Sequence, residues 1–396
     1  MSDENAGSFH PPPEASLERS WQHSESPEEL LEGPKATQDA DPLMDQLSGR
    51  IGSLQIAEDG QLRFYGATSN LHILHNGPLS LSRSYFRSLQ NGEEMLRRTD
   101  VGHFVDTDLE DHLLKLYFCW EDPSIHVVDE DVFWRERNKC RASNQVSYVY
   151  SEVLTNAMCA VGATLTSRHY PHLPEPLADF FATRAKVLLE LEMDAPKLST
   201  VQSLVVLSAV EALLARDARG WLDSGMAVRV AVDLGLHLDP QPYVEAGIIE
   251  PEEAMLRNEV WGGVFVHDRM WSLYVGRPVG IDDKNITAPF PRAKGQHVRY
   301  WEPYIDDCEG LDLPRLANPI EEISMYNITL CAKMNPIRET LYPDGATGLQ
   351  GLRNLYSFAT KTRSQLFQWH AGLPESLTVN ETDPTRFYLP HVLQLQ

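Results

Sequence analysis

Residues 257–291 read RNEVWGGVFVHDRMWSLYVGRPVGIDDKNITAPFP, and this stretch predicts a helix, a sharp corner and then an extended acidic loop. The Arg, Trp, Phe, Asp and Ser at positions 257, 261, 265, 268 and 272 lie three or four residues apart, so they share one helix face. The Gly-Arg-Pro sequence at 276–278 ends the helix, because glycine permits a positive φ and proline cannot continue a helix. Two prolines close the acidic loop.

The face formed by these five positions combines one acid and one arginine with bulky aromatic side chains. Such a face suits neither solvent nor an ordinary core, and a charge left unpaired in a core costs several kcal/mol. We therefore expect Asp268 and either Arg257 or Arg269 to find charged partners on neighbouring helices.

The same stretch contains little that could serve catalysis. Asp282 and Asp283 form the one acidic pair that could serve a magnesium-dependent reaction, but they follow a proline corner and have no second metal-binding motif. His267 and Asp268 are adjacent, so on a helix they point in different directions. The sequence also lacks a nucleophile elbow, a phosphate loop and a dinucleotide fingerprint, so we expect no enzyme and no catalytic residue.

Outward from this stretch, apolar residues follow helical spacing, and no convincing strand alternation or long repeat is present. The pattern predicts an all-α fold with helix packed on helix. Helices are expected to begin near Asp108, Asp129 and Pro251, with a capping box at 199–202. Further helices are predicted at 146–165, 177–191, 204–214, 221–234, 316–342 and 348–370.

The bulk composition limits the class of partner. The chain has 396 residues, 42% of them hydrophobic, and a formal net charge of −23. Phosphate backbones are bound mainly through Lys and Arg, so direct DNA binding by these residues is not expected. The five cysteines include no C-x-x-C pair, which argues against zinc and favours reduced thiols in an intracellular compartment. We find neither a signal peptide nor an apolar run of the ~20 residues that a membrane span needs.

Residues 1–60 differ from the rest of the chain. They contain 13 Asp and Glu against three Lys and Arg, and we expect a disordered acidic tail. The alternative is an acidic interaction or activation segment, with its leucines set among the acids. The remainder, 61–396, is expected to form one domain whose helical core covers about 108–370.

A family resemblance joins these features. The segment GMAVRVAVDLGLH at 225–237, together with the Arg, Trp, Asp-Arg, Ser and Gly-Arg-Pro of the opening stretch, resembles the fungal-specific transcription factor domain. This is the middle regulatory region of fungal zinc-cluster transcription factors, and the sequence is particularly similar to the branch that includes nitrogen-assimilation regulators. The signature residues are Gly225, Ala227, Leu234, Gly235, Arg257, Trp261, Asp268, Arg269, Ser272, Gly276, Arg277, Pro278, Asp283 and Pro289.

The resemblance implies an all-α regulatory module of a nuclear transcription regulator for RNA polymerase II genes, in a metabolic, nitrogen-related or biosynthetic set. It implies other transcription factors or co-regulators as partners, and a possible small-molecule effector. In the family, zinc ions and DNA contact belong to a separate six-cysteine module. This sequence lacks that pattern and ends as a new apolar helix begins near Tyr388, so we expect no cofactor here and DNA contact only indirectly. The alternatives are an α-helical metabolite sensor or a magnesium-dependent enzyme.

Overall fold

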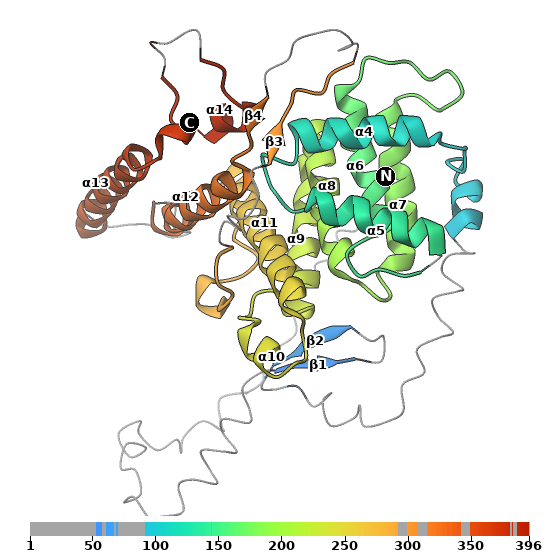
Figure 1. The fold of residues 1–396 in the computed structure, drawn as a ribbon. Coiled ribbons are helices and arrows are strands. Elements are labelled where there is room, and N and C mark those ends of the chain that lie inside the picture. Colours follow the sequence, from blue (N-terminus) through green and yellow to red (C-terminus); the bar gives the residue numbers. More distant parts are fainter. Residues whose placement is uncertain are drawn as a thin grey trace, which may run out of the picture. The chain divides into compact units, whose positions relative to one another are not determined.

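The computed structural model describes residues 53–57, 61–66, 69, 92–143, 145–291, 299–306, 315–341, 349–380, 382 and 386–395. The chain divides into two units, 1–51 and 52–396, and every described residue belongs to the second. The predicted tail therefore lies outside the described residues apart from 53–57. The expected all-α fold is confirmed, because the described part of the chain is predominantly helical (Figure 1).

The helices follow one another with short connections, except at residues 276–319 and 372–389. They are α4 (Thr107–Trp120), α5 (Glu130–Ser143), α6 (Glu152–Leu165), α7 (Leu177–Glu192), α8 (Leu198–Leu213), α9 (Asp217–Asp233), α10 (Gln241–Glu245), α11 (Pro251–Val275), α12 (Ile320–Leu341), α13 (Leu349–Ala371) and α14 (Pro390–Leu395). Two 3-10 turns, η1 (Asp283–Asn285) and η2 (Glu375–Leu377), lie between the later helices. No helix within the described ranges has the length and apolarity needed to cross a bilayer.

Side-chain caps set where several helices begin. Asp106 accepts the Asp108 N–H at 3.0 Å at the start of α4, and Asp129 accepts the Val132 N–H at 3.1 Å at the start of α5. The prediction of a helix from residue 146 is wrong at its start, because Ser151 caps α6 and the preceding residues are not helical.

The predicted capping box at 199–202 is also displaced. α8 begins at Leu198, and the Thr200 hydroxyl accepts the backbone N–H of Lys197 at 2.9 Å. The cap is therefore two residues earlier than the sequence pattern indicated. Once begun, α8 is buried on most sides.

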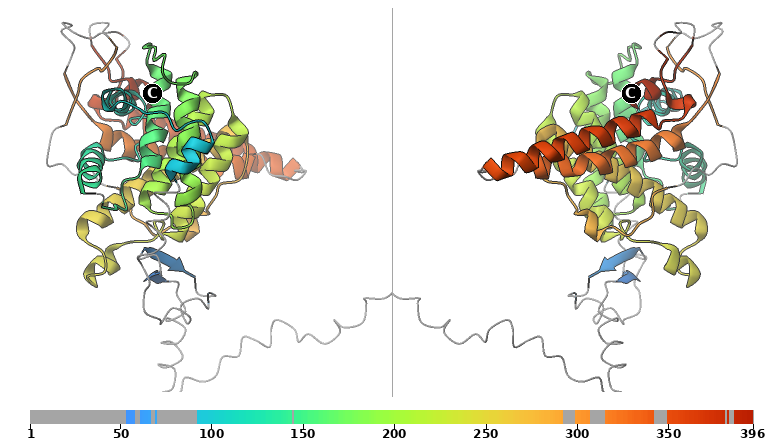
Figure 2. Two further views of the ribbon diagram at one scale, coloured as in Figure 1. Left: turned by 90° about the vertical axis from the view of Figure 1, so that its right-hand side faces the viewer. Right: turned by 90° about the vertical axis from the view of Figure 1, so that its left-hand side faces the viewer.

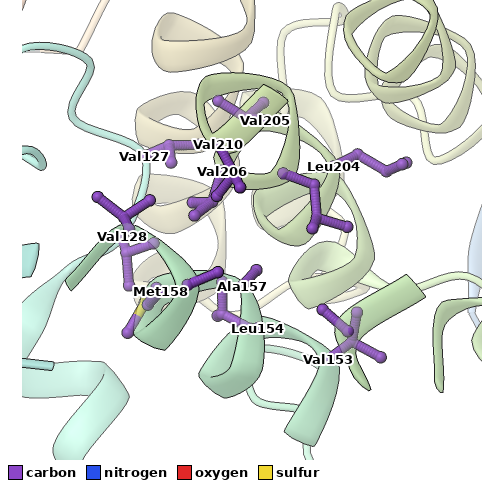
Figure 3. Packing of buried hydrophobic residues seen from close by; sticks show 14 of the residues in the cluster. Val127, Val128, Val153, Leu154, Ala157, Met158, Leu204, Val205, Val206 and Val210 are labelled. Atoms are coloured by element: carbon purple, nitrogen blue, oxygen red, sulfur yellow. The ribbon is translucent and has the colours of Figure 1, made fainter. Parts of the chain in front are cut away.

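The core is built around α6 and α8. Apolar side chains of α6 point towards those of α8 in the close view of Figure 3, with two valines of the segment before α5 beside them. α4 crosses α6 so closely that a Cβ on Gly162 would lie 2.2 Å from the Leu113 carbonyl oxygen. α9 packs on α8, and α11 packs on both of them. This bundle fixes the position of α11, which carries five of the fourteen signature residues.

Two short antiparallel sheets were not predicted. β1 (Ser53–Ile56) pairs with β2 (Leu62–Tyr65), and β3 (Tyr300–Trp301) pairs with β4 (Leu316–Ala317). Strands of two to four residues are too short to show a period of two, which explains why the pattern missed them. β1 also begins inside the segment 1–60, so the boundary placed at residue 60 falls within the hairpin.

Candidate functional site

The family signature converges on α11 and on the elements that touch its two ends. At the amino-terminal end, Arg257 is buried and its guanidinium donates to the carbonyl of Leu234, at the end of α9. Its other nitrogen lies 3.5 Å from the Glu253 carboxylate, one helical turn earlier. Burial lowers the pKa of Arg257, and Glu253 opposes that change. Arg257 thus ties the end of α9 to the start of α11.

The turn after α9 depends on a glycine. Gly235 has a φ of 69°, which L side chains rarely adopt. A Cβ there would lie 2.1 Å from the Leu54 side chain of β1, so the hairpin also needs the space. Trp261 is buried beside this turn, with its ring 6.1 Å from that of His237.

A polar group, which we call the corner network, lies at the other end of α11, and its two members on that helix are buried. It consists of Asp268, Arg269, Gly280, Asp283 and Asn335. Arg269 donates to Asp268 at 2.7 Å and to Asp283 at 2.7 Å, while the Gly280 N–H donates to both Asp268 oxygens at 3.0 Å. Asn335 of α12 donates to the second Asp283 oxygen at 2.9 Å. The network therefore joins α11, the loop after it and α12.

The Gly-Arg-Pro corner itself is held through backbone groups. Gly276 has a φ of 68°, and the Arg277 N–H donates to the Ser272 carbonyl at 2.9 Å. The Ser272 hydroxyl donates to the Pro278 carbonyl at 3.2 Å, and Arg338 of α12 donates to the Gly276 carbonyl at 3.2 Å. The helix end is thus closed by the pattern that a C-terminal glycine allows.

The expected pairing partners are only partly correct. Asp268 pairs with Arg269, its neighbour on the same helix, and Arg257 pairs with Glu253 on the same helix. Neither ion pair reaches a neighbouring helix, because the chain folds back and brings loop and backbone groups to these side chains. Burial raises the pKa of Asp268, while Arg269 and the Gly280 N–H oppose the rise.

The magnesium alternative gains no support from the geometry. Asp282 pairs with Lys284 at 2.6 Å, whereas Asp283 is bound by Arg269 and Asn335, so the two carboxylates serve different partners. His267 is buried, with neither ring nitrogen hydrogen-bonded to a described residue, and burial lowers its pKa to about 3. It is therefore a neutral core side chain without access to a substrate.

The zinc ions of the wider family do not fit these residues. Thiolates bind zinc, but burial raises the pKa of Cys119 to about 11 and that of Cys331 to about 12. Over the described ranges, no three His, Cys, Asp or Glu side chains come together as a metal site would require.

The other signature residues lie apart from the network. Ala227 is buried in α9, Gly225 is exposed with nothing outside its own helix backbone within 4 Å of where a Cβ would lie, and Pro289 is exposed. Their roles stay predictions. Sequence reasoning missed Asn335 and Arg338, because nothing in the α12 pattern marks them as partners of a loop more than fifty residues away. They line a small hollow of about 10 Å³ between α11 and α12, together with Arg269, Ser272, Leu273, Val279, Met334 and Glu339.

Comparison with known proteins decides the family. The model of the fungal specific transcription factor domain matches residues 114–371, which include the whole of α11 and the corner network. The chain belongs to the fungal specific transcription factor domain family. The resemblance drawn from the signature residues is thereby confirmed.

The proteins similar to this chain include several that are named as transcription factors or activators. The chain is 32% identical over 273 residues to the nitrogen assimilation transcription factor nit-4 of Neurospora crassa, covering 66% of this chain and 24% of the relative. It is 31% identical over 366 residues to nirA of Emericella nidulans, also named a nitrogen assimilation transcription factor, covering 89% and 39%. The TY1 enhancer activator of Saccharomyces cerevisiae is 25% identical, covering 89% and 45%.

The chain thus spans less than half the length of these relatives. No solved structure matches it. In the described fold of this chain, Arg257 joins the end of α9 to α11, and the corner network joins α11 to α12.

Proposed function

We propose that this chain is the regulatory region of a nuclear transcription regulator that acts on RNA polymerase II genes. The observation that carries the proposal is the family match over 114–371, together with two relatives named for nitrogen assimilation. A metabolic, nitrogen-related or biosynthetic target set follows from those names.

The proposed mode of action is protein contact without catalysis and without direct reading of DNA. A net charge of −23 disfavours contact with phosphates, and the sequence has no C-x-x-C pair for a zinc cluster. DNA would be reached through a partner transcription factor or another module. The polar residues of α11 support this view, because their contacts serve other parts of the fold and leave no paired nucleophile and base.

A small-molecule effector is the second element of the proposal. The hollow between α11 and α12 borders the corner network, but at about 10 Å³ it is too small for a metabolite, so an effector would have to part the two helices to enter it. A ligand bound there would act on the contact between the two helices. Binding to the folded state would raise the melting temperature of the chain, as linkage requires.

A tethering experiment tests the regulatory role. The full chain is fused to a heterologous DNA-binding module whose site lies upstream of a reporter gene, and the module alone serves as control. We expect the fusion to change the reporter transcript level in either direction. An unchanged level, with the fusion present in the nucleus, would contradict the proposal.

A mobility-shift assay tests the indirect route to DNA. The purified chain alone should leave a duplex probe unshifted at about 0.15 M salt, since its charge repels phosphate. A shift by the chain alone would show that the charge argument fails.

A further inference from the structure

α13 carries an exposed stripe of aromatic and cationic side chains. Its residues are spaced alternately by three and four, so they lie on one face of the helix. Tyr356 is 77% exposed and Phe367 is 62% exposed, which is unusual for aromatic side chains on a long helix. We call this the α13 stripe, and it consists of Arg353, Tyr356, Thr360, Arg363, Phe367 and His370.

The α13 stripe is not the face that attaches the helix to the domain. Attachment uses the face with buried Thr362 and with Trp369, whose indole N–H donates to Thr329 of α12 at 2.9 Å. The Trp369 ring also lies 6.2 Å from that of Tyr326. Figure 2 shows α13 alongside α12, with its far end running out beyond the bundle. The stripe is therefore available to another molecule.

The charge of α13 is opposite to that of the chain. Its residues include Arg353, Lys361 and Arg363 but no Asp or Glu, within a chain of net charge −23. The Arg363 guanidinium lies 5.5 Å from the centre of the Phe367 ring, so cation and aromatic are presented together. Among the residues that the structure describes, none of the three cations is engaged by a carboxylate.

We infer that the α13 stripe is a docking surface for an acidic amphipathic helix of a partner protein. The stripe spans about 26 Å along the helix, which a partner helix of similar length would cover. Aspartate and glutamate of the partner would face Arg353 and Arg363, and its leucine or phenylalanine side chains would cover Tyr356 and Phe367.

Two other occupants fit the charges less well. A nucleic acid would gain few cations on α13 and would meet repulsion from the rest of an acidic chain. A second copy docking stripe to stripe would bring the arginines of one chain near those of the other. An acidic, apolar partner satisfies both the exposed aromatics and the cations.

Direct binding tests the inference with the full chain. The probe is a fluorescein-labelled peptide of sequence DELLDEFLDELLDEFL, and its fluorescence anisotropy is measured at about 0.15 M salt. Two double variants, Arg353→Glu with Arg363→Glu and Tyr356→Ala with Phe367→Ala, should each weaken binding about tenfold or more. The control is Lys361→Glu, which reverses one charge on the same helix but off the stripe, against the two reversed in the arginine variant. It should weaken binding about threefold at most.

Each alternative gives its own result. No peptide binding, or an equal loss with Lys361→Glu, overturns the inference. Tighter binding of a single-stranded DNA oligonucleotide, lost in the same arginine variant, would make the stripe a nucleic-acid surface. A dimer in sedimentation that dissociates with Tyr356→Ala and Phe367→Ala would make it a self-association face. The assay needs no transcription readout, so its failure would leave the proposed function standing.

Discussion

Replacing Asp268 with alanine tests whether the corner network holds the end of α11. Asp268 is nearly buried, with its side chain 8% exposed, and its partner Arg269 is only 2% exposed. Removing one member of a buried ion pair typically costs about 3–5 kcal/mol, because the other charge is left buried. Arg269 keeps Asp283 and the Ile281 carbonyl, so we take the lower end of that range, about 3 kcal/mol. Loss of the bond from Gly280 adds about 1 kcal/mol.

Asp283→Ala is the matched control, because it removes the other carboxylate that binds Arg269. Asp283 is 53% exposed, so its loss should cost about 1 kcal/mol or less. The double variant should cost about 1–2 kcal/mol more than the sum, since Arg269 then has no carboxylate left.

The measurement is urea unfolding of the full chain, followed by tryptophan fluorescence and by far-UV circular dichroism, with the slope against urea compared between variants. A loss below about 1 kcal/mol for Asp268→Ala, or equal losses for the two single variants, would refute the reasoning. Such a result would mean that water can replace the contacts of the corner network at little cost in unfolding free energy.

Three further predictions use the same unfolding assay. Gly235→Ala should cost about 2 kcal/mol, from its positive φ and its collision with Leu54, and the Leu54→Ala background should reduce that cost to about 1 kcal/mol. Gly162→Ala should cost about 3 kcal/mol because its Cβ would strike the α4 backbone. Gly225→Ala, with open space around it, should instead stabilise the fold by about 0.5–1 kcal/mol. Equal effects of the two substitutions would contradict the packing argument. His267 has a folded-state pKa of about 3, below its unfolded value of about 6.5, so the unfolded state binds the proton and stability falls as the pH drops from 6.5 towards 4. His267→Leu should lessen that fall by about 1.4 kcal/mol per pH unit, and an unchanged slope would show that His267 is protonated in the fold.

Local signals in the sequence located much of the fold. Pro251 and Gly276 predicted both ends of α11, and the structure has the helix from Pro251 to Val275. Helix starts were predicted less well where a cap competed with apolar spacing, as at Ser151, since residues 146–150 match the helical period without being helical. Apolar spacing is a property of the side chains, whereas the start of a helix is decided by which group satisfies the first free N–H groups.

The sequence indicated which buried charges need partners, but it did not indicate which groups those partners are. Arg257, Asp268 and Arg269 were singled out as charges that need partners, and each has them. Which partners they have depends on the loop after Gly276, and spacing on a helix says nothing about how a following loop folds back. Sequence separation concealed the contribution of α12 in the same way.

Only one partner of each signature contact can be recognised in the sequence, because the other partner is usually a backbone group. Arg257 binds a carbonyl at the end of α9, Ser272 binds the carbonyl of Pro278, and Asp268 binds the N–H of Gly280. A backbone group is present whatever side chain its residue carries, so the partner position shows no characteristic residue type. The side chains that hydrogen-bond to these backbone groups must be of a particular residue type, so they appear as a motif in the sequence. It follows that the residues supplying the backbone groups should tolerate substitution wherever φ and space allow. The side chains that bind those groups should not tolerate it.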